Sequence, residues 1–239
     1  MELKGEFGHT AVTLDVFKEY VRDVLASKGS RVSDGFQEEL EEVDRAVDRA
    51  SPALFFPTTA AIAVKNRYSN IIPATSSRVV LCEVGADPSS SYINANCVSS
   101  PLGGPTFLAT QAPLSHTAED FWRMLWEKQS QIVVMLTKLR EGDREKCFEY
   151  FPDTDVVKFS ASGIQVVLTK KDVTSDVLVR SLILKRGKES REVFQLQYVG
   201  WPDFGIPTDF ASFAHLFEVY RNLRSSLPLS KAVTIHCRY

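Results

Sequence analysis

The stretch Val233-Thr-Ile-His-Cys-Arg-Tyr239 is the part of this 239-residue sequence on which the prediction of the fold is centred. It starts as an apolar run of the kind found in buried β-strands and continues into a histidine and a cysteine. A strand that leads to a single thiol is the usual support for a loop that presents a nucleophile, which makes Cys237 a candidate nucleophile. A structural thiol at the end of a core strand is the alternative, because free cysteine is among the most buried residue types.

The composition indicates a soluble globular protein with one large domain. The chain has 44% hydrophobic residues and a formal net charge of -2. This charge gives no field that would attract the whole molecule to nucleic acid or to an anionic membrane, so any anion site is local. No apolar run has the length of a signal peptide or of a membrane span, which favours a cytoplasmic protein.

The four cysteines, Cys82, Cys97, Cys147 and Cys237, are far apart in the sequence. They form no C-x-x-C pair, and no histidine stands near them at the spacing of metal ligands. The sequence therefore predicts four reduced thiols, no metal site and no cofactor.

Apolar periodicity predicts a mixed α/β domain. Two amphipathic helices are expected first, one over residues 13–27 and one that starts at a cap at Ser33 or Asp34 and ends before Ser51-Pro52. Later helices are expected at 117–128 and 209–225, and strands at 78–84, 91–98, 106–110, 132–137, 156–159, 163–171, 177–185, 191–198 and in the terminal stretch. Residues 132–137 are apolar on both faces, as in a central strand, and the four runs from 156 to 198 alternate like an antiparallel meander.

Two further clusters are candidates for chemistry. Trp201-Pro202-Asp203 lies between glycines and suits a lid that carries a general acid, although the residues alone slightly favour a turn with an ordinary surface aspartate. Basic residues stand beside Tyr68, in a segment expected to be an exposed loop, and beside Glu141. They indicate either solvated surface or a cationic rim for a dianionic substrate.

Taken together, the motifs of this chain resemble those of the cysteine-dependent, tyrosine-specific protein-tyrosine phosphatases. In order they are Lys65-Asn-Arg-Tyr68, Tyr92-Ile-Asn-Ala-Asn96, Thr110-Gln-Ala-Pro-Leu114, Asp120-Phe-Trp-Arg123, Lys146-Cys147, Tyr150-Phe-Pro152 and Trp201-Pro-Asp-Phe-Gly-Ile-Pro207. Separately most are weak, but in this order they are highly specific. The resemblance implies an N-terminal helical extension over residues 1–35 and a phosphatase domain over 36–239. The domain would be of the α+β type, with a highly twisted mixed central sheet flanked by helices.

The resemblance also implies that phosphotyrosine in proteins is hydrolysed through a phosphocysteine. Cys237 stands at the position of the nucleophile, and His236 would help to hold it as a thiolate. Asp203 stands at the position of the general acid that protonates the departing tyrosine oxygen and then serves as the base for water. Glu141 matches the carboxylate that orients the family's phosphate-binding arginine.

Four residues are assigned to substrate binding by the same resemblance. Tyr68 would stack on phosphotyrosine and set the depth of the pocket, so that the shorter phosphoserine does not reach the thiol. Arg67 belongs to the same motif, and Lys146 matches a lysine near the acid loop. Asn70 replaces the usual aspartate and is expected to hold the peptide more weakly, because it carries no charge. The implied partners are phosphotyrosine proteins, without nucleic acid or membrane.

The largest departure from the family pattern follows Cys237, where the family has five residues, an arginine and a serine or threonine. That loop supplies backbone N–H groups and a bidentate guanidinium to the phosphate. Removing one preorganised donor commonly costs about 100- to 1000-fold in rate. The expectation is a truncated domain of low or no activity that lacks the C-terminal helices and exposes apolar residues 132–136 and 233–235. An inactive pseudophosphatase, or a module that binds phosphotyrosine or a partner, is the alternative.

Overall fold

The computed structural model describes residues 59–100, 104–154, 156–202, 205–228 and 231–238, together with Glu41 and Arg45. The chain divides into two compact units, residues 1–53 and 54–239. In the first unit, Glu41 and Arg45 are helical, as expected from the second predicted helix, and Nε of Arg45 donates to the Glu41 carbonyl at 3.1 Å. The predicted helix over residues 13–27 and the predicted boundary after residue 35 lie outside the described residues.

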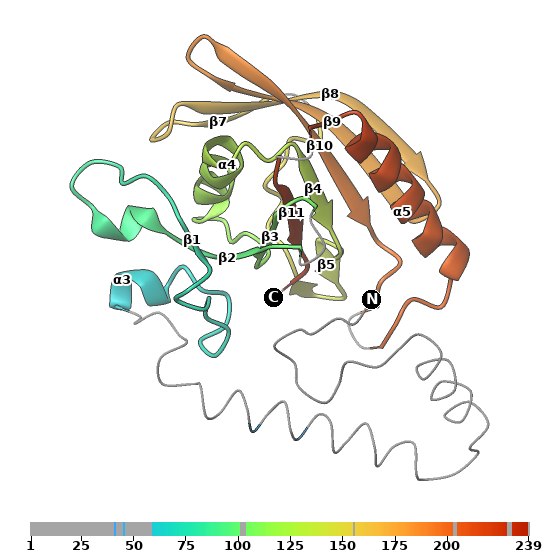
Figure 1. Ribbon diagram of the computed structural model, residues 1–239, viewed down its shortest axis with the longest axis horizontal. Helices are drawn as coiled ribbons and strands as arrows, with labels where there is room; N and C mark the ends of the chain where they lie inside the picture. The colour runs from blue at the N-terminus through green and yellow to red at the C-terminus, as the bar shows by residue number, and fades with distance from the viewer. Residues whose placement is uncertain are drawn as a thin grey trace, which may run out of the picture. The chain divides into compact units, whose positions relative to one another are not determined.

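The second unit combines a long sheet with two main helices (Figure 1). In chain order its elements are α3 (Ala60–Ala63), β1 (Arg78–Val80), the 3₁₀ turn η2 (Pro88–Ser91), β2 (Tyr92–Val98), β3 (Phe107–Thr110), α4 (Ala118–Glu127), β4 (Ile132–Met135), β5 (Arg140–Glu141), β6 (Arg144–Glu145), β7 (Val156–Phe159), β8 (Ile164–Thr174), β9 (Val177–Arg186), β10 (Glu189–Tyr198), α5 (Phe210–Ser225) and β11 (Val233–His236).

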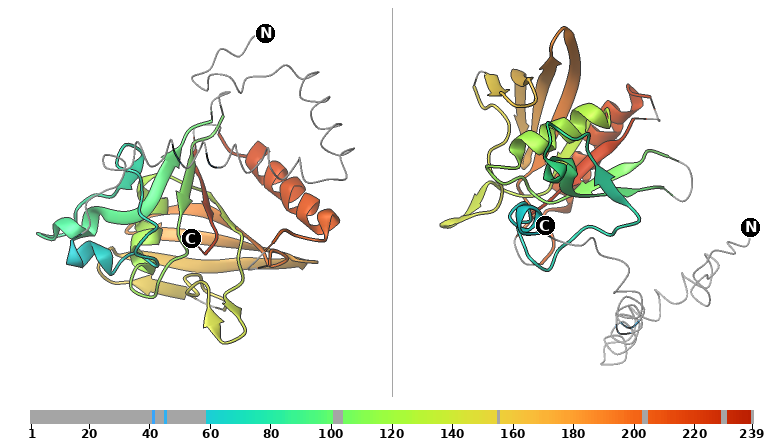
Figure 2. Two further views of the ribbon diagram at one scale, coloured as in Figure 1. Left: turned by 90° about the horizontal axis from the view of Figure 1, so that it is seen from below. Right: turned by 90° about the vertical axis from the view of Figure 1, so that its left-hand side faces the viewer.

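The main sheet has the strand order β1-β2-β3-β11-β4-β10-β9-β8-β7. The last strand in sequence, β11, lies in its middle and runs parallel to both β3 and β4. The pair β4 and β10 is also parallel, whereas the remaining pairs are antiparallel. The strands turn strongly from one end of the sheet to the other (Figure 2). The predicted twisted mixed sheet of an α+β domain is confirmed.

Strand β4 is covered on both faces. Val133 and Met135 belong to the apolar cluster that contains Trp122 of α4. Ile132 and Val134, which alternate with them, belong to the cluster that contains Leu216 of α5. The prediction of a central strand is confirmed, because α4 and α5 pack on opposite faces of this strand.

The expected exposure is wrong for residues 132–135 and 233–234, which are buried, whereas Leu136 and Ile235 are half-buried. Ile132, Val134 and Val233 are each at most 7% exposed. The physical reason is α5, which packs its apolar side onto this face. Free energy is gained by removing this apolar surface from water.

The predicted meander is confirmed in β7 to β10, and its last hairpin turns at Gly187, where φ is +60°.

Strand β1 is shorter than predicted, because side chains of α4 bind the backbone of Cys82. Glu127 accepts from the Cys82 N–H at 2.8 Å, and Arg123 donates to the Cys82 carbonyl. Thr117 precedes α4 as predicted but makes no side-chain cap. Its hydroxyl instead accepts from the N–H of Leu114 at 2.9 Å.

A buried hydroxyl pair fixes β11 against the turn before β4, and it generates a stability prediction. Oγ1 of Thr234 and Oγ of Ser130 lie 2.8 Å apart, with exposed fractions of 0% and 2%. Replacing Thr234 by Val leaves the Ser130 hydroxyl without this partner, and the expected cost in the free energy of unfolding is about 1–2 kcal/mol by urea denaturation.

The matched control is Thr169→Val, which removes an exposed hydroxyl that donates to the Ser181 carbonyl at 2.9 Å. Water replaces that bond, so the control is expected to cost less than half as much. The double variant Ser130→Ala, Thr234→Val is expected to cost less than the sum of its single changes. Equal costs for Thr234→Val and Thr169→Val would contradict the assignment.

Candidate active site

Cys237 emerges from the carboxyl end of β11. Backbone bonds hold the chain on both sides of it: the Leu136 N–H donates to the His236 carbonyl at 2.8 Å, and the Ala112 N–H donates to the Arg238 carbonyl at 3.4 Å. The parallel strands β4, β10 and β11 end at the same level, since Met135 is in register with both Gln197 and His236. The carboxyl ends of parallel strands are the usual place for a ligand in an open sheet.

A pocket of about 310 Å³ opens at these strand ends. It is lined by Leu136 and Thr137 after β4, Trp201 and Pro202 after β10, Cys237 and Arg238 after β11, and Glu141 of β5. Cys237 is half-buried and is not part of a disulfide. The sheet therefore gathers three segments distant in sequence around one accessible sulfur atom.

His236 is buried, at 1% exposure, and both of its ring nitrogens have partners. Nδ1 lies 3.0 Å from the Cys237 carbonyl oxygen, and Nε2 lies 2.8 Å from the Tyr150 hydroxyl. Burial lowers the pKa of His236 to about 4, so the ring is neutral at pH 7. A carbonyl only accepts, so Nδ1 carries the proton and Nε2 accepts from Tyr150. His236 thus orients the backbone of Cys237 without a positive charge.

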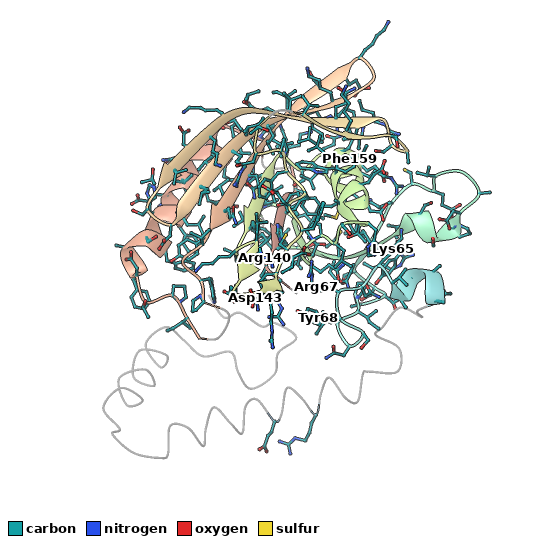
Figure 3. The ribbon with its side chains drawn as sticks, turned by 180° about the vertical axis from the view of Figure 1, so that it is seen from behind. Lys65, Arg67, Tyr68, Arg140, Asp143 and Phe159 are labelled. Carbon is teal, nitrogen blue, oxygen red and sulfur yellow. The ribbon has the colours of Figure 1, made fainter. Side chains whose placement is uncertain are left out.

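Tyr68 lies beside the chain that follows the thiol. Nε of Arg238 donates to the Tyr68 hydroxyl, and the Arg238 guanidinium carbon is 5.2 Å from the centroid of the Tyr68 ring. Figure 3 shows Arg67 and Tyr68 on the same side of the molecule as Arg140 and Asp143 of the β5–β6 hairpin. The structure therefore brings the sequence-predicted residues Tyr68 and Cys237 to the same region.

Arg67, which was assigned to substrate binding, is engaged by the protein itself. Its side chain donates to the carbonyls of Ala112 and Pro113 at 3.4 and 3.0 Å, and it lies 4.0 Å from the Glu145 carboxylate. The segment that carries it was expected to be an exposed loop, but Lys65 to Tyr68 are half-buried. Asn70 is exposed two residues beyond Tyr68.

Glu141 and Lys146 meet at the pocket wall. Their ion pair is 3.4 Å long, with the lysine side chain 3% exposed and the glutamate side chain 24% exposed. The tight β5–β6 turn at Gly142, where φ is +55°, places Glu141 at the pocket. Glu141 therefore lines the pocket, and its carboxylate compensates the charge of the buried Lys146.

Asp203, the predicted general acid, lies outside the described residues. The residues before it are fixed: the Val199 N–H donates to the Asp176 carbonyl at 2.9 Å, and the Trp201 ring meets the Phe213 ring edge-on at 5.6 Å. At Gly200 an added Cβ would stand 2.6 Å from the Tyr198 hydroxyl. Only a glycine fits there without movement of its neighbours.

Comparison with known proteins identifies the family. Residues 63–239 match the model of the protein-tyrosine phosphatases. The chain belongs to the protein-tyrosine phosphatase family. Among relatives, it is 31% identical to the human phosphatidylinositol phosphatase PTPRQ over 99% of this chain and 10% of that protein. It is 29% identical to the human tyrosine-protein phosphatase non-receptor type 12 (94% and 29%), and 34% identical to the mouse receptor-type tyrosine-protein phosphatase C (72% and 14%).

The chain spans less than a third of the length of each of these relatives, which include receptor and non-receptor types. In the described part of the chain, no helix has the length and apolar character needed to cross a membrane. The same residues contain no cluster of three or more histidine, cysteine or acidic side chains suited to a metal ion.

Two buried contacts at the site were not assigned from the sequence. Tyr150 was part of a motif without a role, and its hydroxyl holds His236. Gln197 also had no assigned role. Its Oε1 accepts from the buried Arg180 at 3.0 Å, and its Nε2 donates to the carbonyl of Thr137, which lines the pocket, at 3.1 Å. A buried tyrosine or glutamine next to a motif is the one signal that would have pointed to them.

The lowered pKa of His236 predicts a specific pH dependence of stability. In the unfolded chain His236 binds a proton below about pH 6.5, whereas in the folded chain it binds that proton only below about pH 4, because its pKa is lowered. Stability is therefore expected to fall as the pH drops from 6.5 to 4, by on the order of 3 kcal/mol from this residue. Urea unfolding at several pH values measures it.

Acidic side chains titrate in the same range, so the decisive quantity is a difference between variants. His236→Asn is expected to lose that share of the pH dependence, whereas His215→Asn, on the half-exposed side of α5, is expected to keep it. Parallel stability profiles for wild type and His236→Asn would show that the buried ring is not the cause.

Proposed function

We propose that this chain is a phosphatase domain that hydrolyses phosphotyrosine in proteins through a phosphocysteine on Cys237. The observation that carries the proposal is the accessible thiol at the carboxyl ends of β4, β10 and β11, with the Tyr68 loop beside it. A pocket lined by a thiol, with the Tyr68 ring against the neighbouring Arg238, suits a phosphorylated ring better than a phosphate on a short side chain.

The proposed reaction has two steps. The Cys237 thiolate attacks phosphorus, the bond from phosphorus to the tyrosine oxygen breaks, and Asp203 gives its proton to that oxygen. Water then attacks the phosphocysteine, its proton goes to the Asp203 carboxylate, and the sulfur leaves as a thiolate. Asp203 is assigned from its motif, and the fixed Trp201 and Pro202 at the pocket support its delivery to this place.

The remaining site residues are proposed to position Cys237 and the substrate and to shape the pocket wall. His236 is proposed to hold the Cys237 backbone through its Nδ1–H bond, and the neutral ring adds no cationic stabilisation of the thiolate. Glu141 and Lys146 are proposed to shape the wall next to the acid segment. Tyr68 is proposed as the stacking ring, and exposed Asn70 as a weak contact to the substrate backbone.

The rate of this polypeptide is proposed to be low. Among the described residues that line the pocket, Arg238 is the one cation, and it already contacts Tyr68. Arg67 and Lys146 are held by carbonyls and by Glu141. Phosphoryl transfer depends on donors that are fixed around the phosphate, so turnover by residues 1–239 alone is expected to be about 100-fold or more below that of a phosphatase with such donors.

The test is an assay with one phosphotyrosine peptide and its phosphoserine counterpart. It compares residues 1–239 with the same chain continued by a phosphate-binding loop and helices of the family type. Faster hydrolysis of phosphotyrosine is expected in the continued chain, together with loss of turnover in Cys237→Ser and no change in Cys97→Ser, the matched control in β2. Turnover that survives Cys237→Ser would remove Cys237 as the nucleophile.

Two further outcomes would redirect the assignment. One relative is named a phosphatidylinositol phosphatase, so a phosphoinositide in detergent belongs in the same assay. Preferential hydrolysis of that lipid would contradict the tyrosine substrate. If calorimetry detects binding of the phosphorylated but not the unphosphorylated peptide, and neither chain turns the peptide over, the pseudophosphatase is favoured.

We also propose that the protein acts in the cytoplasm, where its thiols stay reduced.

A further inference from the structure

One buried side chain holds the backbone just before Tyr68. Gln111 is 6% exposed, and it follows β3 directly. Its Nε2 donates to the Lys65 carbonyl at 2.8 Å, and its Oε1 accepts from the Arg67 N–H at 2.8 Å. The side-chain amide thus pairs with the chain on both sides of Asn66, as a neighbouring strand would.

Arg67 attaches the same loop a second time. Its guanidinium donates to the carbonyls of Ala112 and Pro113, the two residues that follow Gln111. The segment 111–113 therefore forms four hydrogen bonds with the loop: it donates one from Gln111 and accepts three from Arg67. Both side chains are largely buried, and buried bonds to backbone groups are expensive to break.

The segment 111–113 is also fixed to the thiol end of β11. Thr110 is in register with His236, and the Ala112 N–H donates to the Arg238 carbonyl. On the other side, the Gln111 N–H donates to the Asn94 carbonyl of β2 at 3.3 Å. The segment thus links the loop that carries Tyr68 to the residue that follows Cys237.

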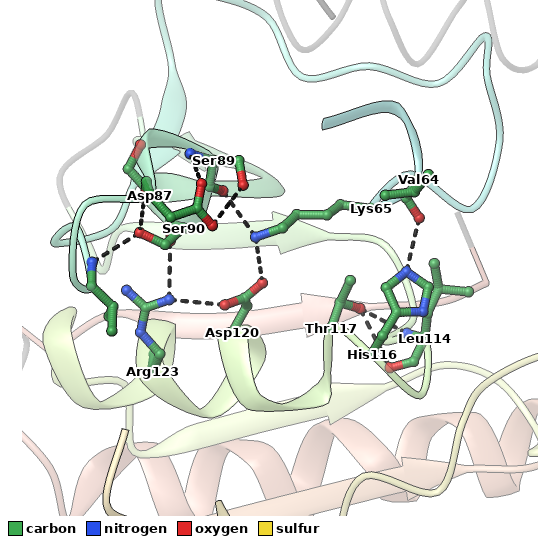
Figure 4. Close-up of polar contacts among 12 residues, drawn as sticks. Val64, Lys65, Asp87, Ser89, Ser90, Leu114, His116, Thr117, Asp120 and Arg123 are labelled. Carbon is green, nitrogen blue, oxygen red and sulfur yellow. Dashed lines mark hydrogen bonds and ion pairs between the residues drawn. The ribbon is translucent and has the colours of Figure 1, made fainter. Parts of the chain in front are cut away.

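The outer side of the loop is held by α4 and η2 (Figure 4). Nζ of Lys65 lies 2.9 Å from the Asp120 carboxylate and donates to the Ser89 carbonyl at 2.9 Å. Nε2 of His116 lies 2.8 Å from the Val64 carbonyl. These contacts fix where the loop starts, and Nδ2 of Asn94 supports the loop on both sides of Tyr68, through the Asn66 side chain at 2.9 Å and the Ile71 carbonyl at 2.7 Å. The two hydrogen bonds of the Gln111 amide, called the Gln111 clamp below, include the bond to the N–H of Arg67, the residue next to Tyr68.

We infer that Gln111 is a positioning residue that fixes the Tyr68 ring relative to the Cys237 thiol, and thereby sets the preference for phosphotyrosine over phosphoserine. The inference rests on the proposed function and adds a residue to it. Arg67 acts in the same way, through the carbonyls it binds. If the Tyr68 ring is held less firmly, the depth of the pocket no longer selects for a phosphate at the end of a long aromatic side chain.

The test substitutes Gln111→Met, which keeps the length and volume of the side chain and removes both of its hydrogen bonds. The value of kcat/KM for the phosphotyrosine peptide is expected to fall about 10- to 100-fold, because small misplacements at a site have effects of this size. The phosphoserine peptide is expected to lose less, so the ratio between the two substrates falls. The assay uses whichever of the two chains described above turns over phosphotyrosine.

The matched control is Gln131→Met, which makes the same change before β4, where Nε2 donates to the Glu192 carbonyl at 3.1 Å. This residue lies outside the pocket lining, and wild-type kinetics are expected. Hydrogen exchange of the Arg67 amide gives a readout without turnover. Exchange is expected to be at least 10-fold faster in Gln111→Met and unchanged in Gln131→Met, since that amide loses its acceptor in the first variant alone.

The outcomes separate the clamp from the proposed function. If the wild type hydrolyses phosphotyrosine and Gln111→Met keeps its selectivity, the inference is overturned and the function stands. If neither chain hydrolyses phosphotyrosine, the proposed function fails. In that case unchanged hydrogen exchange of the Arg67 amide in Gln111→Met is enough to overturn the inference about Gln111.

If Gln111→Met does not fold, Arg67→Lys takes its place, because one ammonium does not reproduce a guanidinium that donates to two carbonyls. Unchanged selectivity in Arg67→Lys would then overturn the inference.

Discussion

Strand β11 lies between β3 and β4, and its backbone hydrogen bonds to both determine where Cys237 emerges. Because β4 and β10 run parallel to it, the segments after all three strands meet at one edge of the sheet. The pocket, the thiol and the Trp201 segment follow from this arrangement. The helices α4 and α5 stabilise it by covering the two faces of β4, so the site depends on burial at a distance from its chemistry.

The charged groups near the site mainly hold the protein together. Lys65 pairs with Asp120, Arg67 binds two carbonyls, and Lys146 pairs with Glu141. Arg180 is buried over the Phe151 ring and donates to Gln195 and Gln197. Positive charge close to a phosphate site does not by itself bind phosphate, because a cation with an internal partner has to break that contact first. This distinction separates Arg67 as a positioning residue from the substrate-binding role that its motif implied.

The sequence predicted the strands well where local pattern and tertiary burial agree, as in β4 and in the meander from β7 to β10. It failed where a contact comes from far along the chain. Side chains of α4 end β1 early at Cys82, and α5 covers strands that were expected to be exposed. The motifs selected Tyr68 and Cys237 for one site, and the structure places Tyr68 against Arg238, the residue after Cys237. No local pattern shows that Gln111 and Arg67 hold the loop that carries Tyr68. Hydrogen bonds between side chains and distant carbonyls leave no periodic trace in a sequence.

The central claim is that Cys237 takes the phosphoryl group from phosphotyrosine. Its most direct measurement is rapid acid quenching of the reaction with a phosphotyrosine peptide, followed by peptide mass spectrometry. Acid unfolds the protein and protonates the Asp203 carboxylate that serves as the base for water, so catalysed hydrolysis of the intermediate stops. The account therefore predicts the added mass of one phosphoryl group on the peptide that contains Cys237. It also predicts that Cys82, Cys97 and Cys147 stay unmodified. Release of phosphate without the added mass on Cys237, or with that mass on another residue, would contradict the central claim.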